Sequence, residues 1–86
     1  MNPDEVVRRA AELIGVAEAR LYSRERRRPV AEARAVASSW LVDRLGMRVV
    51  DVAEILRVSS PSVCAAVAKG RALIDTRRLR LDEGDN

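Results

Sequence analysis

The residues best able to bind a charged partner are arginines gathered in one short stretch. Residues 20–28 read RLYSRERRR, with five Arg and one Glu, a local net charge of +4 in a chain whose overall net charge is +3. A basic cluster of this kind in a small domain is typical of a surface that binds a polyanion. The alternative is a solvated charged surface without a partner, and the cluster alone favours neither interpretation.

Side chains suited to catalysis or to metal binding are scarce. The chain has no His and a single cysteine, Cys64, so it lacks the usual ligand set for zinc and cannot form an internal disulfide. No partner evident in the sequence would activate the Cys64 thiol, and no His can act as a base near neutral pH. We therefore expect no enzymatic activity, no metal site and no cofactor.

The length of 86 residues predicts one domain with a single core. Val, Ala and Leu supply nearly all of the 48% apolar fraction, which suits closely packed helices. No apolar run approaches the length of a membrane span, and the N-terminus lacks the pattern of a secretory signal. We expect a cytoplasmic protein that does not associate with membranes.

Start and stop signals define the first helix. Asn2 is suited to an N-cap, Pro3 to the first helical position and Glu5 to the first turn, while Gly15 is a stop signal. Apolar residues recur at helical spacing between these signals. A short second helix is expected within residues 16–22.

A loop over residues 23–28 precedes the third helix. Pro29 disfavours helical dihedrals in the residue before it and is well placed to open a helix, which we expect to run to about Leu45. Trp40 lies on its apolar face as a core anchor. The residues expected largely off that face are Glu32, Arg34, Ser38, Asp43 and Arg44.

The remainder of the chain predicts two further helices. Residues 49–56 form a short amphipathic segment, and after a tight two-residue turn Ser59 can cap another helix. Gly70 is expected to mark a bend or an end in that helix. The sequence thus predicts an all-α bundle of five to six helices over residues 1–76, with a polar tail over residues 77–86.

The segment at about residues 49–70 has the spacing of a helix-turn-helix, whose second helix can enter the major groove of DNA. The small Ala53 sits where the two helices must approach closely. Arg57 departs from the usual Gly at the start of the turn, and Arg48 replaces the usual capping Ser or Thr. Any two amphipathic helices joined by a short turn would give a similar pattern, and this alternative stays open. The positions expected to pack the pair against the domain are Val52, Leu56, Val58, Val63 and Ala66.

From about Leu13 to Gly70 the order of elements resembles the C-terminal DNA-binding domain of the bacterial replication initiator DnaA, which belongs to the Trp-repressor-like group. In both, a short helix ends in a basic loop, here residues 22–28, and a long helix then leads to the helix-turn-helix. The resemblance implies that arginines of the loop enter the minor groove. The candidates by position are Arg26, Arg27 and Arg28.

The recognition helix departs from the initiator's pattern. The initiator's Asp-His-Thr signature is absent, and this chain reads Ser60-Pro61-Ser62 there. Binding to the initiator's own boxes is therefore not implied. Residues 26–63 are more similar to the DnaA-like tail domains of REP-associated tyrosine transposases. That similarity implies either a larger parent protein, with its catalytic residues outside this chain, or a free-standing remnant.

Double-stranded DNA is therefore the predicted partner. Arg, Lys, Asn and Gln are the strongest readers of base edges, and none occurs in the first turns of the recognition helix, so we expect phosphate contacts to dominate affinity. Shape readout by the loop could favour A/T-rich DNA. The alternative is a degenerate helix-turn-helix that serves as a protein-interaction or oligomerisation domain, and a homodimer is compatible with both. The candidate DNA-binding residues are Arg24, Arg26, Arg27, Arg28, Arg48, Ser59, Ser60, Ser62, Cys64, Ala65, Lys69 and Arg71.

Overall fold

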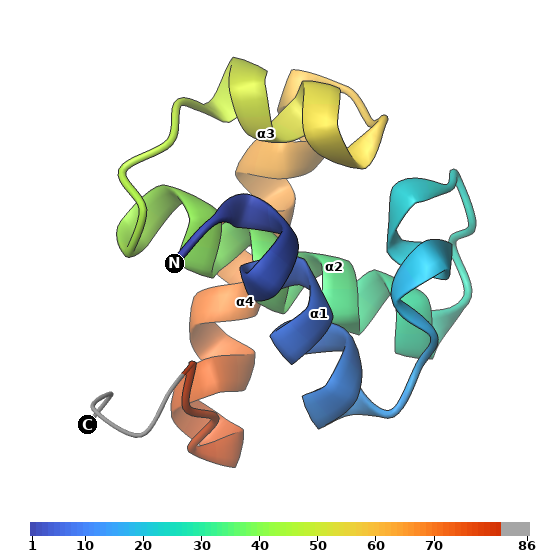
Figure 1. Ribbon diagram of the computed structural model, residues 1–86, viewed down its shortest axis with the longest axis vertical. Coiled ribbons are helices and arrows are strands. Elements are labelled where there is room, and N and C mark those ends of the chain that lie inside the picture. The colour runs from blue at the N-terminus through green and yellow to red at the C-terminus, as the bar shows by residue number, and fades with distance from the viewer. Residues whose placement is uncertain (82–86) are drawn as a thin grey trace.

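The computed structural model describes residues 1–81, which form an all-helical fold without strands. The all-α prediction is confirmed. The number of helices differs from the expected five to six, because the described residues form four α-helices and the expected second helix is one short 3-10 helix. In chain order (Figure 1) the elements are α1 (Pro3–Ile14), η1 (Glu18–Tyr22), α2 (Arg28–Asp43), α3 (Val49–Leu56) and α4 (Ser60–Arg77).

Local signals in the sequence fix the ends of several helices. The Asn2 side chain accepts a hydrogen bond of 2.9 Å from the Glu5 backbone N–H, and Gly15 ends α1 in the left-handed conformation with φ of 89°. The Ser59 hydroxyl accepts a bond of 3.2 Å from the Ser62 backbone N–H at the start of α4. Each cap satisfies a backbone group that the helix itself leaves without a partner.

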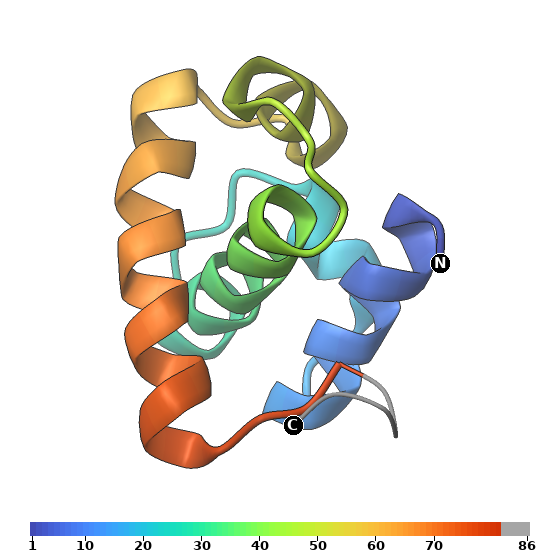
Figure 2. The same cartoon turned by 90° about the vertical axis from the view of Figure 1, so that its left-hand side faces the viewer.

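Helix α2 is the centre of the fold. Figure 2 shows α2 between α1 on one side and α4 on the other, and α2 also contacts η1 and α3. As a result every residue from 33 to 41 is buried, on all sides of the helix. The core around it gathers Val6, Val7, Ala10, Leu21, Val36, Trp40, Leu41, Val52, Leu56, Val63 and Val67.

Two expectations for α2 were wrong. The helix spans Arg28–Asp43, so it begins one residue before the expected Pro29 and ends two residues before the expected Leu45. Arg34 and Ser38, expected off the apolar face, are both buried. The physical reason is that a helix surrounded by neighbours has no solvent face along its middle, so apolar periodicity cannot separate inside from outside there.

Gly70 does not bend or end α4, which continues to Arg77. Instead it marks the closest approach of α4 to α2. An ideal Cβ on Gly70 would lie 2.0 Å from the carbonyl oxygen of Ala35 and 2.9 Å from Ser39 Cβ. The glycine is therefore required by the crossing of two helices, at the expense of helix propensity.

The chain after α4 returns to the core. Leu81 is buried, and the backbone carbonyl of Arg80 accepts a hydrogen bond of 3.0 Å from Arg9 Nε. Leu81, which belongs to the segment expected as a polar tail, therefore packs in the core, and residues 82–86 of that segment lie outside the described residues. Within residues 1–81, no helix combines the length and the apolar character needed to cross a membrane.

Candidate functional site

An open groove of about 1120 Å³ lies on the surface of the described residues, bounded by four segments of the chain. One wall is the basic loop that links η1 to α2, and the opposite wall is the first half of α4. The floor is formed by α2, and the turn between α3 and α4 closes one end. Its lining includes Tyr22, Ser23, Arg24, Arg26, Ala31, Arg34, Ala35, Ser38, Arg57, Val58, Ser59, Ser62, Ala65, Ala66 and Lys69.

The groove is strongly cationic. Its lining contains four arginines and one lysine and no carboxylate. Arg34 is buried, whereas the other four basic side chains are exposed to solvent. Within residues 1–81 these four make no ion pair, so their charge is available to a partner from outside. The four are Arg24, Arg26, Arg57 and Lys69.

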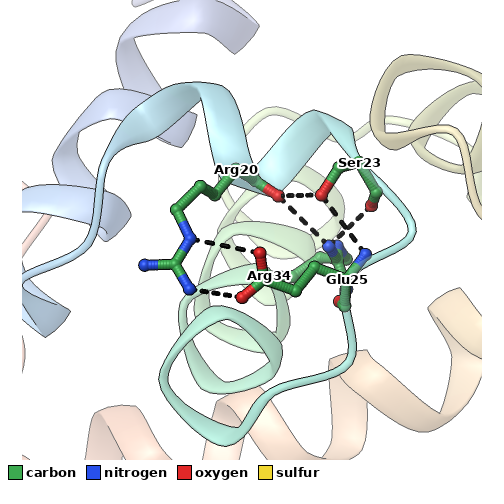
Figure 3. A network of polar contacts seen from close by, with 4 residues as sticks. All are labelled: Arg20, Ser23, Glu25 and Arg34. Atoms are coloured by element: carbon green, nitrogen blue, oxygen red, sulfur yellow. Dashed lines mark hydrogen bonds and ion pairs between the residues drawn. The ribbon is translucent and has the colours of Figure 1, made fainter.

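Buried Arg34 holds the basic loop against α2 (Figure 3). Its Nη1 donates to the Glu25 carbonyl at 2.9 Å, and its Nη2 donates to the Ser23 carbonyl at 2.7 Å and to the Arg20 carbonyl at 3.4 Å. Its Nε donates to the Leu21 carbonyl at 3.1 Å. The planar guanidinium has enough N–H donors to bind all four carbonyls at once, and few other side chains can do so.

A second set of contacts closes the same loop. Arg20 and Glu25 form an ion pair, with Arg20 Nε 3.2 Å from Glu25 Oε1. The hydroxyl of Ser23 donates to the Arg20 carbonyl at 2.7 Å and accepts from the Glu25 N–H at 3.2 Å. The hydrogen bonds from Arg20 hold the pKa of the Glu25 carboxyl below its usual value. Burial lowers the pKa of Arg34, but guanidinium groups remain charged in proteins.

Tyr22 lies at the edge of the groove and ties the loop to the start of α1. Its hydroxyl lies 3.3 Å from a Glu18 carboxylate oxygen and 3.4 Å from an Asp4 carboxylate oxygen. Partial burial, with a smaller contribution from these two negative charges, raises the pKa of Tyr22 to about 12. The phenol is therefore neutral across the physiological range.

The first half of α4 exposes small side chains beside the groove. The exposed residues of its first turns are small, and none of them is acidic. Ser59 and Ser62 are linked through their hydroxyls at 2.8 Å. The exposed members of this face are Ser59, Pro61, Ser62, Cys64, Ala65, Ala68 and Lys69, and Ser60 is half-buried.

Six of the twelve residues predicted from the sequence line the groove together, and the other six do not. Arg27 and Arg28 are exposed at the end of the loop, and Arg28 Nε lies 4.0 Å from Glu32. Ser60 and Cys64 lie on α4 outside the groove lining. The groove members are Arg24, Arg26, Ser59, Ser62, Ala65 and Lys69.

The two remaining predicted arginines are engaged with carboxylates. Arg48 pairs with Asp51 at 3.0 Å in the first turn of α3. Arg71 makes a two-pronged contact with Asp43, at 2.8 Å from Nε and 2.6 Å from Nη2, and it lies on the other side of the α2–α4 crossing. The hydrogen bonds from Arg71 lower the pKa of the Asp43 carboxyl, which keeps this pair ionised.

Sequence reasoning missed two arginines of the groove. The apolar periodicity places Arg34 on the solvent side of its helix, and no local pattern reveals that it binds carbonyls 9 to 14 residues earlier in the chain. In the sequence, Arg57 stands out only as a departure from a turn consensus. One signal could have identified Arg57 as a functional residue. Arg at a turn position that favours Gly has a conformational cost, which indicates a role for its side chain.

The described residues contain no group of three or more His, Cys, Asp or Glu side chains that could hold a metal ion. Comparisons of the chain with models of protein families, with curated proteins and with solved structures gave no match.

Proposed function

We propose that this chain is a double-stranded DNA-binding module in which α3 and α4 act as a helix-turn-helix. The observation that carries the proposal is the groove between the basic loop and α4, lined by five cations and no carboxylate. A cationic surface without carboxylates is suited to the phosphate backbone of DNA. Contacts to that backbone supply most of the non-specific affinity of proteins for DNA. The resemblance to the initiator's DNA-binding domain supports the same function.

The arrangement of α3 and α4 supports the helix-turn-helix part of the proposal. Of the positions expected to pack such a pair against the domain, Val52, Leu56 and Val63 are buried, and Val58 and Ala66 are half-buried. Three residues separate the end of α3 from the start of α4, and the first half of α4 carries no other element on its exposed face. A helix with an uncovered first half has room to enter a major groove about 12 Å wide.

Binding in this proposal is dominated by the backbone, with limited reading of bases by α4. The exposed residues of its first turns are Ser, Pro, Cys and Ala, which offer few of the two-pronged contacts that separate one base from another. The loop arginines would lie in the adjacent minor groove, as the resemblance implies. Preference for A/T-rich DNA would then come from minor-groove width rather than from base contacts.

The test is fluorescence-anisotropy binding of the full chain to a random-sequence duplex and an A/T-rich duplex, across a salt series from about 50 to about 200 mM. We expect affinity to fall steeply with salt. The double variant Arg24→Ala/Arg26→Ala should weaken binding and reduce the slope of log Kd against log salt by roughly 1.8, or about 0.9 for each lost phosphate contact.

The matched control is Arg8→Ala/Arg80→Ala, which removes the same charge from exposed arginines outside the groove lining. Arg8 pairs with Glu18 at 3.2 Å, but a surface pair of this kind contributes at most about 1 kcal/mol. The control should retain most of the affinity and of the slope. Equal losses in both variants would mean that only net charge matters and that the groove is not the interface.

One observation favours the second candidate function, a protein-interaction or oligomerisation domain. The exposed face of α4 carries small apolar groups, among them Pro61, Ala65 and Ala68, on which a partner helix could pack. If the chain binds neither duplex at the lowest salt, the DNA proposal is wrong. A concentration-dependent dimer in sedimentation equilibrium, abolished by Ala65→Glu, would then support the second function.

A further inference from the structure

Two arginines in the described chain adopt the left-handed backbone conformation that favours glycine. Arg57 ends α3 with φ of 57° and ψ of 43°, and Arg78 ends α4 with φ of 53° and ψ of 47°. A side chain in this conformation is strained, because Cβ crowds the following carbonyl oxygen. At the end of α1 the chain uses Gly15 for the same purpose, so glycine would serve at residue 57 as well.

The backbone role of residue 57 does not require an arginine. The N–H of Arg57 bonds to the Ala53 carbonyl to cap α3, and the N–H of Val58 bonds to the same carbonyl at 3.0 Å. Both are main-chain contacts that glycine would make equally well. An explanation for the arginine must therefore lie in its side chain.

The Arg57 side chain lies at the end of the cationic groove, next to the start of α4. It is exposed, and within residues 1–81 it makes no ion pair and no side-chain hydrogen bond. Arg24, Arg26 and Lys69 line the same groove. A cation held at a strained position, without an internal partner and beside other unpaired cations, is suited to an external anion.

We propose that Arg57 is a DNA-contacting residue that binds a backbone phosphate at the end of the groove, and that its strained conformation is tolerated for this contact. The inference rests on the proposed DNA-binding function and adds to it a residue in the turn between α3 and α4. Because a guanidinium bound to phosphate carries no base information, Arg57 contributes to affinity and salt dependence for every DNA sequence equally.

The test compares two variants that make the same chemical change at the two strained positions. Arg57→Gly and Arg78→Gly each remove one positive charge and one left-handed side chain, but Arg78 lies at the far end of α4 and outside the groove lining. Both should unfold at a higher denaturant concentration than the unaltered chain, as monitored by circular dichroism. Only Arg57→Gly should lose DNA affinity, by roughly threefold to tenfold, with the salt slope reduced by about 0.9.

A third variant, Arg57→Lys, keeps the charge and the strain but removes the planar fork. It should restore the salt slope while recovering only part of the affinity. The inference is overturned if Arg57→Gly and Arg78→Gly change the affinity and the slope equally. If the unaltered chain binds no duplex at low salt, the failure lies in the proposed function, and the two outcomes are thereby distinguished.

Discussion

Replacing Gly70 with Ala is expected to destabilise the fold, although the same change at an exposed helix position would stabilise it. An ideal Cβ on residue 70 would lie 2.0 Å from the carbonyl oxygen of Ala35 and 2.6 Å from the carbonyl carbon. Carbon and oxygen atoms ordinarily approach no closer than about 3.3 Å, so α2 and α4 would have to separate by roughly 1.3 Å at this point. The obstructing atoms belong to the backbone of the central helix and cannot move aside alone.

Two opposing effects set the magnitude. Overpacking of a well-packed core costs about 1–3 kcal/mol, and a backbone obstruction in the middle of α2 places this site at the upper end of that range. The Ala side chain recovers about 1 kcal/mol through its higher helix propensity. The net expectation is a loss of about 2 kcal/mol in the free energy of unfolding, or a fall in Tm of about 8–16 °C for a domain of this size.

The assay is denaturant unfolding followed by circular dichroism and by the fluorescence of Trp40, the single Trp, which is buried in the core. Ala72→Gly at an exposed position of α4 is the control, because it reports the propensity effect without a packing effect and should cost about 1 kcal/mol. If Gly70→Ala unfolds at the same denaturant concentration as the unaltered chain, or at a higher one, the close contact between α2 and α4 is wrong.

Three further predictions concern the loop and the groove. Arg34→Ala should lower the free energy of unfolding by at least roughly 2 kcal/mol and accelerate amide hydrogen exchange in residues 20–27, because four carbonyls lose a charged donor. Tyr22, the single Tyr, should titrate near pH 12 by absorbance, because its pKa is raised from about 10 in the unfolded chain. The contribution of Tyr22 to stability should therefore be constant below pH 10 and fall as pH rises towards 12. Tyr22→Phe should remove this fall, and its absence in the unaltered chain would contradict the burial described for the ring. Lys69→Ala should weaken DNA binding more than Arg71→Ala in the anisotropy assay, because Asp43 already neutralises the charge of Arg71. A larger loss of affinity for Arg71→Ala would place the interface on the other side of α4.

The elements of this fold follow closely from local chemistry. Asn2, Gly15 and Ser59 act through backbone groups within a few residues, so the sequence alone predicts the limits of α1, the span of α3 and the start of α4. The 3-10 geometry of residues 18–22 was not predictable in the same way, because helix formers there favour either helix type and the short connection to α2 decides between them.

Contacts between distant elements were not predictable from local patterns. In the sequence, Gly70 has the appearance of a helix breaker. Its presence is explained only by the close approach of Ala35 and Ser39 of α2. Arg34 has the appearance of a surface charge, yet its donors are consumed by carbonyls of the loop. In both cases the deciding partner belongs to another element, so residue type and spacing along one helix carry no information about it.

The same distinction explains why the overall charge of +3 understates the charge of the groove. Fifteen of the sixteen basic residues are Arg, and the fold divides them by long-range pairing: Arg71 reaches Asp43 across 28 residues and Arg77 reaches Glu32 across 45. These pairs link α4 to α2 and contribute no net charge. The unpaired cations of the groove face one another across a surface without carboxylates, where their potentials add. A polyanion would therefore meet a local charge that neither the composition nor the arginine cluster at residues 20–28 reveals, since Arg57 comes from the turn between α3 and α4 and Lys69 from α4.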